Sequence, residues 1–187
     1  RENLAAAFLY ELFEGISDPV TLVDPMCGSG TFLTEGLHFG TPLHLRPFAF
    51  ETAPFFKGKL VRKTDPLAGF PIKEAVGFDV NQDLISKIPS LKLIHADSLK
   101  EKLPVEGEKL IICNPPYGER IKVEGKRGSF LKQAWKKFLE VDQPLRFGWL
   151  LPSDMDDLFQ RASGYHLINK RHLKNGGLAV TFWLWER

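Results

Sequence analysis

The chain has 187 residues, of which 43% are hydrophobic and 26% charged, and its formal net charge is +2. This composition is typical of one ordinary soluble domain, and no apolar run approaches the ~18 residues that would span a bilayer, so we do not expect a membrane protein. The two cysteines, Cys27 and Cys113, have no CxxC spacing, which argues against a disulfide scaffold and favours a reducing compartment, with the cytoplasm as the default.

The first residues predict a helix. The chain begins at Arg1 without an initiator methionine and continues directly into an apolar helical pattern that contains Leu4, Phe8 and Leu12. The layout of a signal peptide is absent. We interpret residues 1–187 as a single domain that forms part of a longer protein.

Apolar runs alternate with helix-like patterns along the chain, which predicts an α/β fold with a mainly parallel sheet. Residues 41–73 follow neither period for long and are interpreted as an insertion with a short helix around 54–61. Near the C-terminus, two strand-like segments flank an Asn-Gly-Gly sequence at 175–177, which predicts an antiparallel hairpin. Between these features we expect strands at 20–23, 75–78, 91–94, 110–113 and 147–151, and helices at 31–38, 82–88, 129–141 and 155–162.

The segment VTLVDPMCGSGTFLTEG, residues 20–36, predicts a strand, a tight glycine turn and a helix start. Gly28 and Gly30 permit positive φ and the close approach of a ligand, and Thr31 and the N–H groups after it provide donors at a helix N-terminus. Leu33 stands where a dinucleotide fingerprint has its third glycine, and the Gly-Lys-Ser/Thr of a phosphate loop is missing. An ordinary strand-to-helix turn is the alternative interpretation.

Polar side chains end four consecutive predicted strands, at Asp24, Asp79, Asp97 and Asn114. A carboxylate at the mouth of a buried strand costs free energy unless it is paired or solvated, so we expect Asp24 to face a cation. Asp79 is our candidate ribose ligand, and Asp97 could accept from an adenine amino group, although either aspartate could instead cap a helix. Because the carboxyl ends of adjacent parallel strands border one crevice, the four residues predict one site.

The sequence LIICNPPYGER, residues 110–120, ends a buried strand with an amide, two prolines and an aromatic ring. An exocyclic amine of a nucleobase is a poor nucleophile unless hydrogen-bond acceptors orient its N–H groups. The Asn114 amide oxygen and the proline-fixed carbonyl of Pro115 form such a pair of acceptors. Tyr117 can stack on a base that has swung out of its helix. The segment therefore predicts methylation of a base amine.

These motifs together resemble a known family. DPMCGSGTF at residues 24–32 and NPPYGER at residues 114–120, with ENLAAAFL, RPFAFE and LKNGGL elsewhere, are similar to the catalytic domain of the bacterial RNA guanine-N2 methyltransferases that carry a THUMP domain. The resemblance covers nearly the whole chain. Asn-Pro-Pro-Tyr alone also occurs in DNA adenine-N6 and protein glutamine methyltransferases, whereas the continuation Gly118-Glu119-Arg120 narrows the match.

The resemblance implies a doubly wound, Rossmann-like class I methyltransferase fold with a mainly parallel seven-stranded sheet and a C-terminal antiparallel hairpin. It also implies S-adenosyl-L-methionine as the methyl donor and guanine N2 of structured RNA as the acceptor, with rRNA ranked before tRNA as the substrate. It implies no metal, and it implies an RNA-binding THUMP domain upstream of this chain. The implied donor residues are Asp24, through the donor's ammonium group, with Pro25, Cys27, Gly28, Ser29, Gly30 and Thr31, then Asp79 for the ribose and Asp97 with Ser98 for the adenine. The implied target-base residues are Asn114, Pro115, Pro116 and Tyr117.

Basic residues gather just after the Asn-Pro-Pro-Tyr motif, and either RNA phosphates or solvent could face them. The basic residues that we expect to contact phosphates are Arg120, Lys122, Lys126 and Arg127.

Two other functions stay open. The first is an adenine-N6 methyltransferase that acts on DNA or RNA, and the second is a nucleotide-binding module without catalysis.

Overall fold

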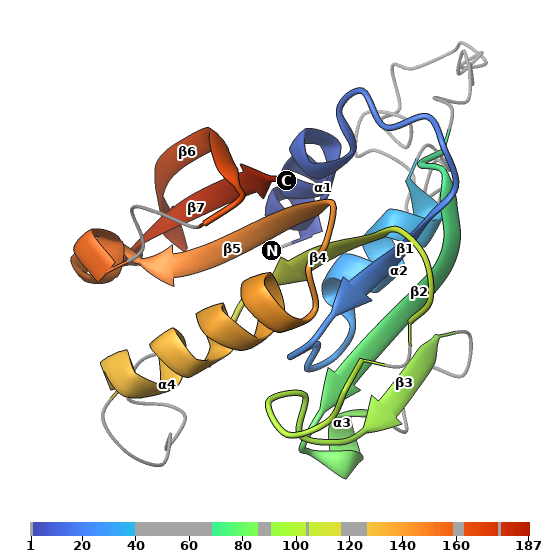
Figure 1. The fold of residues 1–187 in the computed structure, drawn as a ribbon, viewed down its shortest axis with the longest axis horizontal. Coiled ribbons are helices and arrows are strands. Elements are labelled where there is room, and N and C mark those ends of the chain that lie inside the picture. The colour runs from blue at the N-terminus through green and yellow to red at the C-terminus, as the bar shows by residue number, and fades with distance from the viewer. Residues whose placement is uncertain are drawn as a thin grey trace, which may run out of the picture.

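The computed structural model describes residues 2–39, 69–85, 91–103, 105–116, 127–158, 163–175 and 177–187 (Figure 1). These residues form one seven-stranded sheet in the order β3-β2-β1-β4-β5-β7-β6. The first five strands in the sequence are parallel, whereas β7 runs antiparallel to both β5 and β6. The predicted α/β fold, with its mainly parallel sheet and C-terminal antiparallel hairpin, is confirmed.

Every predicted strand is present, and the hairpin strands flank the Asn-Gly-Gly turn. The strands are β1 (Val20–Asp24), β2 (Ile72–Asp79), β3 (Lys92–His95), β4 (Lys109–Cys113), β5 (Arg146–Pro152), β6 (His166–Asn175) and β7 (Leu178–Glu186). The helices are α1 (Glu2–Phe13), α2 (Thr31–His38), α3 (Gln82–Ile85) and α4 (Arg127–Trp135), followed by the π-helix η2 (Lys136–Val141) and the 3-10 helix η3 (Ser153–Leu158).

The predicted insertion and the predicted helix at 155–162 differ from the structure. The insertion was extended too far, because Ile72 already pairs with Val20 as part of β2. The rest of the insertion, with its predicted helix at 54–61, lies outside the described residues. The predicted α-helix at 155–162 is wrong in type and start, since a 3-10 helix begins at Ser153, where serine and aspartate side chains favour turns over a helix interior.

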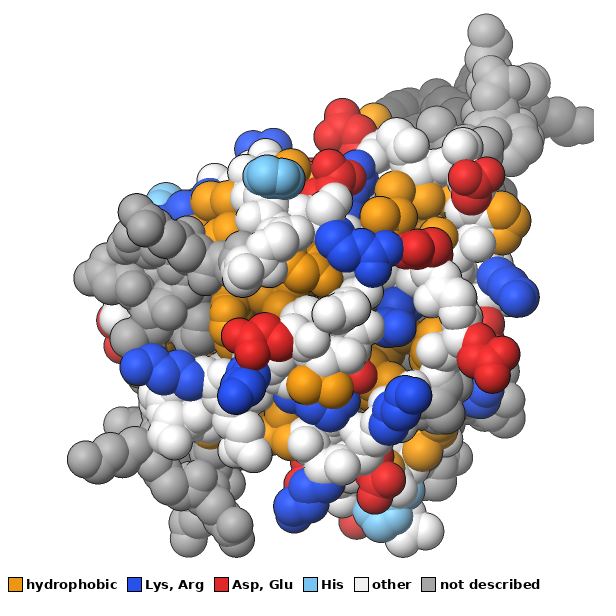
Figure 2. Space-filling view, in the orientation of Figure 1, with side chains coloured by type: hydrophobic (Ala, Val, Ile, Leu, Met, Phe, Trp, Pro, Cys, Tyr) orange, Lys and Arg blue, Asp and Glu red, His pale blue; other side chains and the backbone are white. Residues whose placement is uncertain are grey.

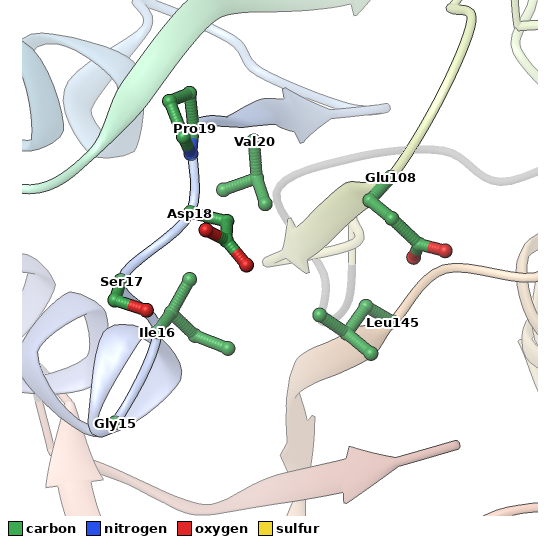
Figure 3. A pocket seen from close by; sticks show the side chains of 8 residues that line it. All are labelled: Gly15, Ile16, Ser17, Asp18, Pro19, Val20, Glu108 and Leu145. Atoms are coloured by element: carbon green, nitrogen blue, oxygen red, sulfur yellow. The ribbon is translucent and has the colours of Figure 1, made fainter.

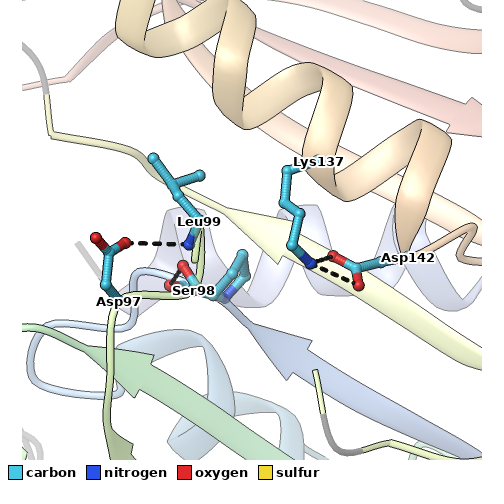
Figure 4. Close-up of polar contacts among 6 residues, drawn as sticks. Asp97, Ser98, Leu99, Lys137 and Asp142 are labelled. Carbon is cyan, nitrogen blue, oxygen red and sulfur yellow. Dashed lines mark hydrogen bonds and ion pairs between the residues drawn. The ribbon is translucent and has the colours of Figure 1, made fainter. Parts of the chain in front are cut away.

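The predicted helix at 129–141 is present, but its second half is a π-helix. The N–H of Asp142 donates to the carbonyl of Lys137 at 3.1 Å, which is the five-residue spacing of a π-turn. The Lys137 ammonium also donates to both carboxylate oxygens of Asp142, at 2.8 and 2.9 Å (Figure 4). This buried ion pair therefore joins the same two residues as the π-turn and favours the wider helix.

Two hydrophobic clusters lie on opposite faces of the sheet. We call these the α1 face, which α1 and α2 cover, and the α4 face, which α4 and η2 cover (Figure 1). Successive strand residues alternate between them, so that Leu22 and Leu110 pack on the α1 face while Val23 and Ile111 pack on the α4 face. The central strands are therefore buried on both sides, which explains why they read as unbroken apolar runs.

Candidate functional site

The carboxyl ends of β1, β2, β3 and β4 lie side by side. We call this end of the strands the carboxyl edge of the sheet, as distinct from the edge strands β3 and β6. Val23 of β1 pairs with Ile111 of β4, and Asp24 pairs with Gly77 of β2, in parallel register. The polar residues predicted from the sequence stand at or just after these ends. The structure therefore brings Asp24, Asp79, Asp97 and Asn114 to the same edge of the sheet, as expected.

The glycine turn between β1 and α2 has the predicted backbone. Gly28 has φ 53° and Gly30 has φ 72°, which are left-handed values that favour glycine. Gly30 is the N-cap of α2 and supplies no side-chain hydrogen bond to the first N–H groups of the helix. Among the atoms of the described residues, none would lie within 4 Å of a Cβ on Gly28. Such a turn leaves helix N–H donors for a polar ligand.

Asp79 connects this turn to the end of β2. One carboxylate oxygen accepts the N–H of Gly28 at 2.8 Å, and the other accepts the N–H of Asn81 at 2.8 Å. A main-chain bond reinforces the contact, because the N–H of Cys27 donates to the carbonyl of Phe78 at 2.8 Å. Each carboxylate oxygen has a further lone pair, so Asp79 can still accept from hydroxyl groups.

Asp24 is 2% exposed and accepts the N–H of Met26 at 3.2 Å. Burial raises the pKa of its carboxyl group from 3.8 to about 7, and the nearby charge of Asp79 acts in the same direction. Within the described part of the chain, no Lys, Arg or His forms an ion pair with this carboxylate. The cation predicted to face Asp24 is therefore not a described side chain, and that expectation stays a prediction.

Asp97 and Ser98 hold the loop that follows β3 (Figure 4). The Ser98 hydroxyl is buried and donates to the carbonyl of Pro25 at 2.6 Å, which fastens this loop to the one after β1. Asp97 accepts the N–H of Leu99 at 3.1 Å and pairs with Lys100 at 3.0 Å. Asp97 thus stabilises its own turn, and its predicted contact with an adenine edge stays a prediction.

The target-base motif follows β4 directly. Asn114 is exposed and Pro115 is buried, so the amide lies at the surface while the first proline anchors the segment. Tyr117 lies outside the described residues, as do the basic residues at 120, 122 and 126. The backbone of Arg127 begins α4, but its side chain is not described.

Cys113, the last residue of β4, lies near Asp24, a proximity that the sequence did not predict. Its thiol is buried, and burial together with the charge of Asp24 raises its pKa well above the ordinary value. Burial and the same carboxylate also raise the pKa of Cys27. Both thiols stay protonated at neutral pH, so neither is an activated nucleophile. Each cysteine adjoins a site motif in the sequence, and this proximity was the available signal.

A second feature missed in the sequence is a chain of hydroxyls at the end of β5. Thr181 of β7 is fully buried, and its Oγ1 lies 2.9 Å from Oγ of Ser153 and 3.0 Å from Nδ1 of His172. This chain joins η3, β7 and β6 across the carboxyl end of β5. The polar Thr181 inside the otherwise apolar run at residues 178–185 was the signal.

A pocket of about 300 Å³ lies at the opposite edge of the sheet (Figure 3). Its wall is the loop at residues 15–20, with Glu108 and Leu145, which precede β4 and β5. Because these residues stand at the amino ends of the strands, the pocket is separate from the predicted site.

Within the described residues, no group of three or more His, Cys, Asp or Glu side chains could hold a metal ion. The helices that the structure describes are all too short or too polar to cross a membrane.

The chain is similar to proteins that are described as methyltransferases. The sequence model described as RMKL-like, methyltransferase domain, matches residues 1–182. Ribosomal RNA large subunit methyltransferase K/L of Hahella chejuensis is 29% identical over 215 residues, which cover 100% of this chain and 29% of that protein. The protein of the same name from Buchnera aphidicola subsp. Acyrthosiphon pisum is 30% identical over 154 residues, which cover 67% of this chain and 21% of the relative. The chain therefore spans less than a third of these relatives.

A solved structure supports the same assignment of fold. The crystal structure of SMU.472 complexed with SAH has a TM-score of 0.71 and 26% sequence identity. The similarity covers 98% of this chain and 52% of that one.

Proposed function

The chain belongs to the RMKL-like methyltransferase domain family and has the class I methyltransferase fold, and from this premise we propose that it methylates the exocyclic N2 of guanine in structured RNA. Its methyl donor is S-adenosyl-L-methionine. The names of the curated relatives favour rRNA of the large subunit over tRNA as the substrate. The single observation that carries the proposal is the Asn-Pro-Pro segment beside the glycine turn at one edge of the sheet.

The residues at this edge fit the donor. S-adenosyl-L-methionine supplies an electrophilic methyl group on a positively charged sulfur, together with an ammonium group, a ribose and an adenine. A buried carboxylate with a raised pKa, such as Asp24, gains a partner if an ammonium group reaches it. Gly28 and Gly30 let a ligand approach the backbone, and Asp79 can accept ribose hydroxyls while it holds the turn. We assign the remaining donor contacts to Pro25, Cys27, Ser29, Thr31, Asp97 and Ser98.

The target amine would be oriented by the segment after β4. The amide oxygen of Asn114 and the carbonyl of Pro115 can each accept one N–H of an exocyclic amine, which directs the nitrogen lone pair away from the base plane. Pro115 is buried, so the position of its carbonyl is fixed by packing. Pro116 and Tyr117 complete the proposed base pocket, with Tyr117 stacking on the base.

Part of the RNA-binding surface would lie outside the catalytic domain. Because the chain spans less than a third of its curated relatives, we assign further RNA contacts to an upstream THUMP domain in the longer protein. Within this chain, Arg120, Lys122, Lys126 and Arg127 are the proposed phosphate contacts near the target base.

Methyl incorporation tests the proposal. The full-length protein is incubated with labelled donor and with rRNA, tRNA or DNA, and the products are digested to nucleosides for mass spectrometry. N2-methylguanosine in rRNA is the expected product. N6-methyladenosine as the sole product would contradict the proposal and favour the adenine-N6 alternative, whereas a protein that fails to bind the donor would be a non-catalytic module.

A further inference from the structure

The strand β6 at the edge of the sheet is rich in positive charge. Its ten residues, His166–Asn175, contain Lys170, Arg171, Lys174 and two histidines, and no Asp or Glu. In the space-filling view, basic and histidine side chains lie along the rim of the molecule over this strand (Figure 2). An edge strand often has lysines to prevent pairing with other sheets, so position must decide whether these do more.

Three of these groups share one face of the strand. Lys170 pairs with Trp183, His172 with Thr181, and Lys174 with Ala179. Trp183 packs on the α4 face, and paired and alternate residues share a face, so all three basic residues lie on the α4 face. All three are exposed. On the opposite face Arg171 forms an ion pair with Glu11 of α1.

We propose that Lys170, His172 and Lys174 form a basic ladder that binds the phosphate backbone of a single-stranded segment of the substrate RNA. This inference rests on the proposed function and adds a second contact surface to it. Alternate residues of a strand are about 6.8 Å apart, of the same order as successive phosphates along an extended polynucleotide. The ladder therefore matches a strand of RNA in charge and in spacing.

Two members of the ladder are held in place. The Lys170 ammonium lies 4.1 Å from the centroid of the Trp183 ring, which is a cation–π contact. The His172 ring is fixed by the contact of Nδ1 with the buried hydroxyl of Thr181 at 3.0 Å. Side chains that are already ordered lose less conformational entropy when they bind a ligand.

One end of the ladder lies near the carboxyl edge of the sheet, where the proposed site is. Val180 of β7 pairs with Pro152, the last residue of β5, and Lys174 stands opposite Ala179, one residue beyond that pair. Lys174 therefore lies just beyond the carboxyl end of β5, whereas Lys170 is level, through Trp183 and Trp149, with Cys113 at the end of β4. Three strand spacings separate β6 from β4, which amounts to roughly 14 Å in the plane of the sheet. A few nucleotides could span this distance to Asn114.

Salt-dependent RNA binding tests the ladder. The variants are the double change Lys170→Gln with Lys174→Gln, and the control Lys73→Gln, which removes an exposed charge at the amino end of β2. Affinity of the full-length protein for a fluorescent single-stranded RNA is measured between about 50 and 200 mM salt. Each phosphate contact contributes about 0.7 to the logarithmic slope, so the double variant should bind about 25-fold more weakly near 0.1 M salt, with a slope flatter by about 1.4. The control should match the wild type.

The outcomes are distinguishable. Thermal melting shows whether the double variant is folded. If it is folded and its RNA affinity equals that of Lys73→Gln, while the wild type methylates RNA, the ladder is contradicted and the proposed function stands. If the wild type neither binds nor methylates RNA, both are overturned. If the double variant loses only solubility, the lysines serve to protect the edge strand and the ladder is likewise contradicted.

Crosslinking gives a second, independent measurement. Because Cys27 and Cys113, the two cysteines of this chain, are buried with raised thiol pKa values, a new surface cysteine in residues 1–187 reacts before either of them. With a thiol-directed photo-crosslinker, Lys174→Cys should capture the RNA and Lys73→Cys should not. Equal capture by the two variants, or capture by Lys73→Cys alone, would contradict the proposal.

Discussion

The carboxylate of Asp79 accepts the main-chain N–H of Gly28 at 2.8 Å, although the two residues are 51 positions apart in the sequence. This bond fixes the glycine turn after β1 to the end of β2. The residue chosen from the sequence as a ribose ligand therefore also sets the shape of the turn on which the donor would rest. One side chain can thus organise two parts of the cofactor site.

Replacing Asp79 tests this double role. Asp79→Ala removes two hydrogen bonds to a charged acceptor, each worth roughly 1.5–3 kcal/mol, and should weaken donor binding by more than about tenfold. Calorimetric titration with S-adenosyl-L-methionine measures the loss. Asp83→Ala, which removes an exposed acid from α3 nearby, is the charge-matched control. Equal affinities for the two variants would refute the role given to Asp79.

The buried carboxyl group of Asp24 predicts a pH-dependent stability. Its pKa is about 7 in the folded protein and 3.8 in the unfolded chain, so the folded state holds the proton more tightly. Its contribution to the free energy of unfolding is therefore complete below about pH 4, falls as the pH rises to about 7, and is constant above that. The total loss is at most about 4 kcal/mol.

The variant Asp24→Asn cannot titrate and should lack this loss. Without donor at pH 8, it should be more stable than the wild type by up to about 4 kcal/mol, as measured by urea unfolding. It should also bind the donor more weakly, because the ammonium group loses its anionic partner. An identical pH dependence in wild type and variant would show that Asp24 is not buried as a neutral group.

The sequence predicted much of the edge that carries the site, and the reasons are local. Gly28 and Gly30 stand where only a left-handed turn connects β1 to α2, and both adopt positive φ. The end of β4 was visible because Asn114 and two prolines interrupt an apolar run. Such signals depend on residues close together in the chain, so they survive without knowledge of the tertiary structure.

Contacts between distant segments were not predictable in this way. The Ser98 hydroxyl donates to the carbonyl of Pro25, 73 positions away, and no feature of the sequence around either residue indicates it. The π-helix was also missed, because an ordinary helical period describes residues 129–141 equally well and only the buried Lys137–Asp142 pair explains the wider turn. These features follow from packing rather than from local pattern.

Packing beneath the glycine turn gives a further prediction. A Cβ on Gly77 of β2 would lie 2.7 Å from Cδ2 of Leu93 and 2.8 Å from both Sγ of Cys27 and Cδ1 of Leu33. Gly77→Ala should therefore lower the free energy of unfolding by about 1–3 kcal/mol, because these side chains must shift. Since Cys27 begins the turn, donor affinity should fall as well.

Gly69→Ala is the matched control for this variant. Among the described residues, the nearest atom to its Cβ would be the carbonyl oxygen of Phe39 at 3.5 Å, which is ordinary van der Waals contact. Urea unfolding of both variants, with donor titration of each, measures the difference. A Gly77→Ala protein as stable as Gly69→Ala would mean that β2 and the turn pack more loosely than described.

In the proposed function, the carboxyl ends of the parallel strands hold both the methyl donor and the target amine, and Asn114 acts on the amine alone. The most direct measurement compares donor affinity with the single-turnover rate of RNA methylation for the wild type and Asn114→Ala. Loss of one acceptor that acts in the transition state should lower the rate by about 100-fold to 1,000-fold, while the dissociation constant of S-adenosyl-L-methionine stays within about twofold. A parallel loss of donor affinity and rate would place Asn114 in the donor pocket and contradict the proposed role of Asn114.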